Sequence, residues 1–227
     1  MDMKNQKRRA IEAVAKQFSA TMEEGGGVSE PHVRIAGKKV SLQVATIRKQ
    51  GGSRTKPRLR FDKVAIRLLE QLQAGLHEAV PDGVIVLVSV TAPIRLAAKT
   101  EAVLQEKARA LLMRRLGEPS ERGTINSNQI RIRVVRTDAR PASKVIGFVH
   151  NPETDPQVLF DATRSLLRVL SDPMSSKGSG DRWLVLLNPG GPSHLEAYRY
   201  IYSQLRIPTH FKKAVMVFAD GRVETLA

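Results

Sequence analysis

The residues best suited to binding chemistry are six cations in a run of thirteen residues, 48–60, that contains no acid. Arginine and lysine bind phosphate groups through charge-assisted hydrogen bonds. Glycine and proline within the run predict a loop rather than a helix. Six like charges in one loop repel one another, and an anionic partner relieves that repulsion. We therefore predict that the loop contacts nucleic acid through Arg48, Lys49, Arg54, Lys56, Arg58 and Arg60.

A second group of cations lies in the segment 130–136, where apolar and charged residues alternate. This alternation places Ile130 and Ile132 on one face of a strand and Arg131 and Arg133 on the other. The two arginines either point into solvent or contact an anion. We include both among the predicted nucleic-acid-binding residues.

A third candidate site lies at the start of the helix that is expected after the buried strand 84–90. Arg95 and Lys99 lie near its first turn, and Glu101 is the first acid. Cations oppose the helix dipole at this position, whereas a bound anion accepts hydrogen bonds from the free backbone N–H groups. Open α/β sheets also bind ligands where their strands end. We predict an anion site at Arg95 and Lys99; the alternative is that both side chains are merely solvated.

Motifs for catalysis are incomplete in this sequence, and none identifies a protein family. Neither a phosphate-binding glycine loop nor a dinucleotide fingerprint follows a predicted buried strand. Ser193 stands where a nucleophilic serine would, but Leu195 replaces the glycine of that motif. The chain has five scattered histidines and no cysteine, so a thiolate metal site is excluded. We assign no catalytic residue, metal ligand or cofactor, and expect a binding protein rather than an enzyme.

A metal-dependent nuclease remains the main enzymatic alternative. Such an enzyme needs two or more acids, because Mg²⁺ prefers hard oxygen ligands. No predicted buried strand carries an acid, so the acids would have to converge in the folded chain. The candidates at expected strand or helix ends are Asp62, Asp138, Glu153, Asp155 and Asp161.

The composition of the chain narrows the class of partner. Its 227 residues include 37 Lys and Arg against 22 Asp and Glu, a formal net charge of +15. Residues 1–60 carry +9, residues 61–150 carry +5 and residues 151–227 carry +1. A hydrophobic content of 41% is enough for a core, which excludes a wholly disordered basic chain. The aromatic content of 4% argues against stacking of single-stranded bases and favours contact with the backbone of a duplex or a folded RNA.

Hydrophobic periodicity predicts an α/β fold with a mixed sheet. Helices are expected at 3–22 and 61–80, from the turn at 91–93 to about 116, from Pro156 onward and from Ser193 onward. Strands are expected at 33–35, 40–47, 84–90, 129–136, 144–149 and 183–187. The chain then ends in a hairpin, 214–219 and 222–226, that turns at Asp220-Gly221.

The order of elements suggests an internal duplication of a strand-strand-helix-strand-helix module. Val84 and Trp183 open matching strands, and Phe61-Asp62 matches Phe160-Asp161 at the same offset of 99 residues. On this basis residues 1–27 form an N-terminal helix and glycine linker, 28–120 a first module with the basic loop, and 121–227 a second module. The alternative is one compact domain whose elements alternate without duplication.

These features together predict a nucleic-acid-binding protein that contacts the phosphate backbone. The alternatives are an enzyme acting on a phosphorylated or nucleic-acid substrate and an interaction subunit that binds an acidic protein. No apolar run reaches the ~18 residues of a membrane helix, and the charged first ten residues do not resemble a signal peptide. We therefore expect a cytoplasmic protein without a membrane partner, and leave its oligomeric state and the choice between DNA and RNA open.

Overall fold

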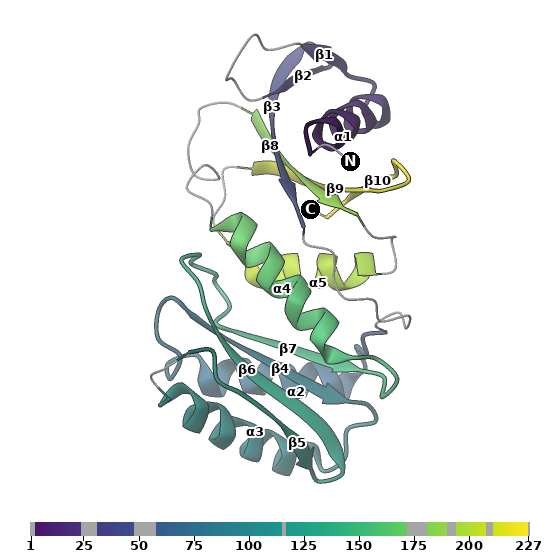
Figure 1. The fold of residues 1–227 in the computed structure, drawn as a ribbon. Coiled ribbons are helices and arrows are strands. Elements are labelled where there is room, and N and C mark those ends of the chain that lie inside the picture. Colours follow the sequence, from purple (N-terminus) through teal and green to yellow (C-terminus); the bar gives the residue numbers. More distant parts are fainter. Residues whose placement is uncertain are drawn as a thin grey trace. The chain divides into compact units, whose positions relative to one another are not determined.

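The computed structural model describes residues 3–23, 31–47, 58–114, 117–171, 181–189, 194–207 and 211–226. Within these ranges the chain forms five helices and ten strands in two sheets (Figure 1). Each sheet contains parallel and antiparallel pairs, which confirms the predicted mixed α/β class. The chain divides into two compact units: unit 1 contains Met1–Gln50, Val169–Leu195 and Thr209–Ala227, and unit 2 contains Gly51–Arg168 and Glu196–Pro208.

Unit 1 is built on a six-stranded sheet in the order β1-β2-β3-β8-β9-β10. Its central strands β3, β8 and β9 run parallel, and the other pairs are antiparallel. Helix α1 (Met3–Gln17) packs its apolar stripe, including Ile11 and Val14, against strand residues such as Leu42 and Val185. The strands are β1 Thr21–Glu23, β2 His32–Ile35, β3 Lys38–Thr46, β8 Asp181–Asn188, β9 Phe211–Phe218 and β10 Val223–Thr225.

Unit 2 is built on a four-stranded sheet in the order β5-β6-β4-β7. β4 pairs with β6 antiparallel and with β7 parallel. Helices α2 and α3 cover one face of this sheet, and α4 lies on the other (Figure 1). The elements are α2 Lys63–Leu76, β4 Val84–Thr91, α3 Ala97–Leu112, β5 Ser120–Ile125, β6 Asn128–Arg136, β7 Val145–His150, α4 Pro156–Leu170 and α5 Leu195–Leu205.

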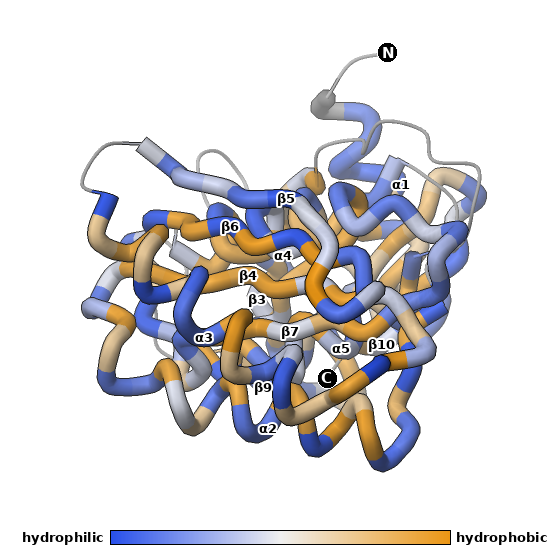
Figure 2. Tube along the Cα trace, turned by 90° about the horizontal axis from the view of Figure 1, so that it is seen from below, coloured by the Kyte–Doolittle hydropathy of each residue, from blue (hydrophilic) through white to orange (hydrophobic). Residues whose placement is uncertain are grey.

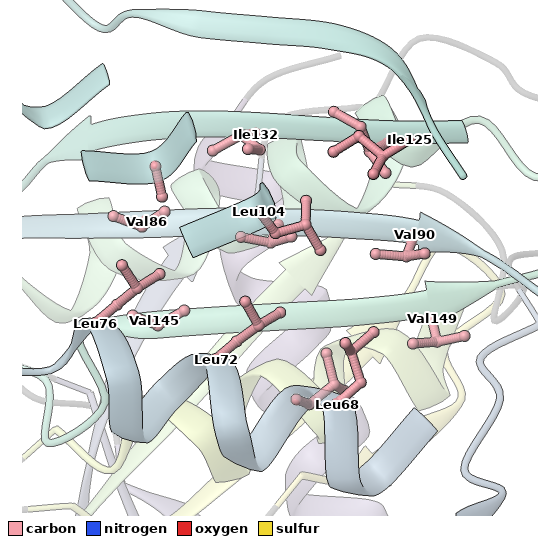
Figure 3. Packing of buried hydrophobic residues seen from close by; sticks show 14 of the residues in the cluster. Leu68, Leu72, Leu76, Val86, Val90, Leu104, Ile125, Ile132, Val145 and Val149 are labelled. Carbon is pink, nitrogen blue, oxygen red and sulfur yellow. The ribbon is translucent and has the colours of Figure 1, made fainter. Parts of the chain in front are cut away.

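The core of unit 2 lies between its sheet and the helices α2 and α3. Leu68, Leu72 and Leu76 recur at helical spacing, and all are at most 1% exposed. They meet valines of β4 and β7 across the interface (Figure 3). Asp62 begins α2, because its carboxylate accepts a hydrogen bond from the Ala65 amide at 3.0 Å.

One glycine allows α2 to approach the sheet closely. A Cβ atom at Gly147 in β7 would lie 2.2 Å from Cδ2 of Leu69. Leu69 is itself buried, so the missing side chain at Gly147 provides the space that it fills.

The predicted buried strand 84–90 is confirmed, since all residues of β4 after Val84 are buried. The terminal hairpin at Asp220-Gly221 is confirmed as well, with Gly221 at a φ of 82°. The first helix ends earlier than predicted, at Gln17, because Ser19 takes a positive φ and Thr21–Glu23 pairs with β2. β5 was not predicted; of its six residues only Ile125 is buried. Figure 2 shows β5 as mostly hydrophilic, whereas β4, on the far side of β6, is apolar.

The matched strands of the predicted duplication lie in different sheets. β4 has one antiparallel and one parallel neighbour, whereas β8 lies between two parallel neighbours. The boundaries of the two compact units also differ from those of the predicted modules 28–120 and 121–227. The internal duplication stays a prediction. In the described parts of the chain, no helix combines the length and the apolar character needed to cross a membrane.

Candidate functional site

Four of the six described candidate residues lie around one end of the unit 2 sheet, which we call the carboxyl edge. It is the end at which the parallel strands β4 and β7 finish, at Thr91 and His150. From there the chain enters α3 on one face of the sheet and α4 on the opposite face (Figure 1). Adjacent parallel strands that diverge in this way form a topological switch point, where α/β proteins usually bind their ligands.

The end of the predicted basic loop lies at this carboxyl edge. Leu59 forms an antiparallel bridge with His150, and the Arg60 amide donates a hydrogen bond to the Val149 carbonyl at 2.8 Å. Alternation along the segment leaves Arg58 and Arg60 exposed on either side of the half-buried Leu59. Pairing with β7 therefore fixes the backbone that carries these two cations. The other predicted loop residues, Arg48, Lys49, Arg54 and Lys56, lie outside the described residues.

Arg95 and Lys99 also belong to the carboxyl edge and have exposed side chains. The backbone of Arg95 is held by Asn128: the Arg95 amide donates to Asn128 Oδ1 at 2.8 Å, and Asn128 Nδ2 donates to the Arg95 carbonyl at 2.9 Å. Asn128 is 1% exposed and also donates to Thr100 Oγ1 at 3.0 Å. Among the described residues, no carboxylate lies within ion-pair distance of either cation. Both charges are therefore uncompensated by the described residues, and Asn128 fixes the backbone that carries Arg95.

The width of the carboxyl edge follows from the number of strand segments that form it. Leu59, His150, Thr91 and Gln129 lie on four successive strand segments, and Thr91 Oγ1 accepts a hydrogen bond from the Gln129 amide at 3.0 Å. Neighbouring strands are ~4.8 Å apart, so the row spans about 14 Å. That span matches about four nucleotides of one nucleic-acid strand at ~3.4 Å axial rise each.

Arg131 and Arg133 lie on the α4 side of β6, as the alternation predicted. Ile130 and Ile132 point into the core on the other side. The two arginine side chains are only 26% and 22% exposed. Arg131 Nη1 lies 3.9 Å from Asp155 Oδ1, and this acid also begins α4 by accepting from the Gln157 amide at 2.9 Å. Part of the positive charge on this face is therefore compensated.

Two cations that sequence reasoning missed join these arginines. Arg122 of β5 is exposed and lies directly opposite Arg131. Arg164 of α4 shares the carboxylate of Glu118 with Arg133, at 3.2 and 3.4 Å. The register of β5 against β6 places Arg122 opposite Arg131, and the packing of α4 places Arg164 near Arg133. No local sequence pattern could have revealed either position. We call Arg122, Arg131, Arg133 and Arg164 the arginine face.

His150 is the titratable group buried at the carboxyl edge. The residue is 2% exposed, and its Nδ1 lies 2.8 Å from the Asn151 carbonyl. Burial lowers the pKa of His150, although the hydrogen bond to Asn151 and the charge of Asp155 partly oppose this. The lowered pKa favours the neutral ring, and its contact with the Asn151 carbonyl holds the turn between β7 and α4.

Three of the five acids considered for a nuclease have structural partners in the fold. Asp62 and Asp155 begin helices, and Asp161 accepts a hydrogen bond from Gln157 Nε2 at 2.6 Å. In the part of the chain that the structure describes, no group of three or more His, Cys, Asp or Glu side chains is placed to hold a metal ion.

Comparisons with protein-family models, curated proteins and solved structures gave no match for this chain. Its function therefore has to be inferred from its own residues.

Proposed function

We propose that the protein binds nucleic acid through the phosphate backbone and that unit 2 is the binding unit. One observation carries this proposal: all six predicted cations that fall within the described ranges belong to unit 2, although they come from three separate segments of the chain. They surround the carboxyl edge or lie on the arginine face next to it. These residues are Arg58, Arg60, Arg95, Lys99, Arg131 and Arg133.

The two groups of cations are expected to contribute differently. Three cations are exposed and have no described carboxylate as a partner: Arg58, Arg95 and Lys99. A phosphate that binds them does not have to compete with a carboxylate. Arg131 and Arg133 already have acidic neighbours, and a polyanion has to compete with these carboxylates. We therefore assign most of the affinity to the carboxyl edge and a smaller share to the arginine face.

The surface favours a duplex or a folded RNA over a flexible single strand. Single-strand binders use several exposed aromatic rings as stacking platforms. Among the described aromatic residues, Phe61 is the one with a largely exposed ring, at 52%. Its ring already contacts Tyr200, with 5.2 Å between centroids. Contacts to phosphates therefore have to supply the affinity.

The experiment is a salt titration of binding to labelled duplex DNA, duplex RNA and single-stranded DNA. Each phosphate contact to duplex DNA contributes about 0.9 to the slope of log K against log salt concentration. The variant in which Arg58, Arg60, Arg95 and Lys99 are all replaced by Gln is expected to flatten the slope by about 3 to 4.

A control variant with the same change in charge replaces four exposed cations of unit 1 by Gln, namely Lys7, Arg9, Lys16 and Lys38. This control is expected to keep the parent slope. Equal losses in the two variants, or no loss in either, would contradict the assignment to the carboxyl edge.

The same titration separates the remaining alternatives. Adding Mg²⁺ reports strand cleavage, which would favour the nuclease. Failure to bind any nucleic acid, together with salt-sensitive binding of an acidic polypeptide such as polyglutamate, would favour the interaction subunit. A cytoplasmic location belongs to the same proposal, because the nucleic acid has to be accessible there.

A further inference from the structure

Leu96, the residue directly before α3, has a backbone conformation that is unfavourable for a leucine. Its φ of 47° and ψ of 54° lie in the left-handed region. A side chain there brings its Cβ close to the following carbonyl oxygen, so glycine or asparagine usually takes such a position. Among the described non-glycine residues with a positive φ, Leu96 is the one with a large apolar side chain. The surrounding structure therefore has to impose this conformation.

Buried polar side chains fix the turn that contains Leu96. Asn128 holds both the amide and the carbonyl of Arg95. Thr100 is completely buried, and its Oγ1 also donates to the Arg95 carbonyl at 2.9 Å. The Thr100 amide donates to the Leu96 carbonyl at 2.9 Å. The peptide groups on both sides of Leu96 are thus held in place, which maintains the strained conformation.

Leu96 contributes little to the stability of the free protein. It is 61% exposed, so its side chain buries little apolar surface. It is also the N-cap residue of α3, yet it has no side-chain oxygen to accept from the first free amides. An exposed leucine is ordinary on a protein surface. One that is held in a strained conformation indicates a role toward a partner, because such strain persists mainly at functional sites.

The neighbours of Leu96 indicate the chemistry of this partner. Arg95 and Lys99 flank it in the sequence, and both are exposed. An apolar side chain between two cations fits a groove that has phosphates along both sides and stacked bases at its floor. The minor groove of B-DNA has this form and is about 6 Å wide. The minor groove of duplex RNA is wide and shallow, so the arrangement favours DNA.

Resting on the nucleic-acid-binding function proposed above, we propose that Leu96 inserts between two base pairs from the minor groove of duplex DNA and bends the duplex. Apolar side chains that insert in this way kink DNA by about 20–90°. Arg95 and Lys99 contact the phosphates on either side of the inserted side chain. The cost of unstacking depends on the base step and is lowest at pyrimidine–purine steps such as TA. The site therefore prefers duplexes that contain such a step.

The test uses two short DNA duplexes, labelled at both ends, that differ only in a central TA or AT step. The minor groove presents the same acceptors at both steps, so a preference between them reports deformability. We expect the parent protein to bind the TA duplex about fivefold more tightly and to raise the energy transfer between its ends. Equal affinities without a change in energy transfer would overturn the insertion alone. Failure to bind either duplex would overturn the proposed function with it, and tighter binding of the matching RNA duplex would overturn the choice of DNA.

Leu96→Asn removes the apolar side chain and keeps both flanking cations. We expect this variant to lose the preference for TA and the change in energy transfer. The slope of log K against log salt concentration should stay at the parent value, because the phosphate contacts remain. Its Tm should rise by about 2–4 °C, since asparagine tolerates the left-handed region.

The matched control is Met113→Asn, which removes an apolar side chain of 81% exposure just after the other end of α3. It should keep the TA preference, the bending and the salt slope of the parent. Bending by Leu96→Asn that equalled the parent's would overturn the insertion, and so would equal losses in the two variants. A lower Tm of Leu96→Asn would show that the leucine serves stability, which removes the basis of the proposal.

Discussion

The hydroxyl of Tyr200 in α5 donates a hydrogen bond to the backbone carbonyl of Gly147 in β7, at 2.8 Å. β7 is the last strand of its sheet, and in the described part of the chain only the single bridge from Leu59 to His150 continues the pairing beyond it. The carbonyls on either side are also satisfied: Gln73 Nε2 donates to Val145 at 3.2 Å and the Arg60 amide to Val149 at 2.8 Å. Donors from three separate segments thus cover an edge that would otherwise invite association with another strand.

The first prediction concerns the hydroxyl of Tyr200. Tyr200→Phe removes the donor and leaves the Gly147 carbonyl without it, so the free energy of unfolding should fall by about 1–2 kcal/mol. Urea denaturation measures this loss. Tyr200→Leu is the comparison, because it also removes the ring contacts with Phe61 and Phe148 and should cost more. Equal stability of Tyr200→Phe and the parent would show that the hydrogen bond contributes nothing.

The second prediction is the alkaline pH dependence that the same residue causes. Burial raises the pKa of Tyr200 from 10.0 to about 12. Above pH 10 the phenol ionises in the unfolded chain while it stays protonated in the folded chain. Its contribution to stability is therefore complete below pH 10 and is lost between pH 10 and 12. The loss amounts to about 2–3 kcal/mol, because one pKa unit corresponds to ~1.4 kcal/mol.

The measurement is urea denaturation of the parent and of Tyr200→Phe at pH 9 and pH 11. Other groups titrate equally in both proteins, so the difference between their unfolding free energies isolates Tyr200. This difference should shrink at pH 11. A constant difference would contradict the raised pKa.

The third prediction tests the close packing of α2 on β7. Gly147→Ala places a methyl group 2.2 Å from the present position of Leu69 Cδ2, so Leu69 has to move within a packed core. We expect a loss of about 1–3 kcal/mol in the free energy of unfolding. Leu69→Ala alone should cost about 2–5 kcal/mol through the cavity that it leaves. The double variant should lose less than the sum, because the new methyl group occupies part of that cavity. Strict additivity in urea denaturation would show that the two sites do not interact.

Local patterns in the sequence predicted the elements of this fold well but not their pairing. The apolar run of β4, the stripe of Leu68, Leu72 and Leu76, and the cap at Asp155 each follow from a few neighbouring residues. By contrast, β4 and β8 carry similar apolar runs yet join different sheets. Sheet partners are distant along the chain, so a local pattern cannot identify them.

The same limit applies to the candidate site. The types of Arg58, Arg60, Arg95 and Lys99 indicated anion binding, but only the pairing of segment 58–60 with β7 brings the first two to the edge that carries the others. Asn128 holds the backbone of Arg95 although the two residues are 33 positions apart in the sequence. β5 escaped prediction because a polar edge strand buries one residue and shows no periodicity.

The fourth prediction is the acidic pH dependence that His150 causes. Burial lowers the pKa of His150 below its ordinary value of 6.5. As the pH falls below 6.5, the unfolded chain binds a proton that the folded chain does not, so the unfolding free energy decreases. Urea denaturation at pH 7.5 and pH 5 should show this decrease in the parent and a smaller one in His150→Gln. An NMR titration of the His150 ring that gave a midpoint at or above 6.5 would contradict the prediction.

The fifth prediction tests the arginine face through the acid that compensates it. Glu118 accepts from both Arg133 and Arg164. Glu118→Gln keeps the shape and an acceptor oxygen but removes the negative charge, so both guanidinium groups should become more available to phosphate. The matched control is Glu121→Gln, which removes the same charge from the α3 side of β5, where Glu121 pairs with Lys107. If nucleic acid lies on the arginine face, Glu118→Gln should tighten duplex binding roughly threefold and steepen the salt slope more than Glu121→Gln does. If the two variants gave the same affinity and slope, the gain would reflect net charge alone, and the nucleic acid would have to bind away from this face.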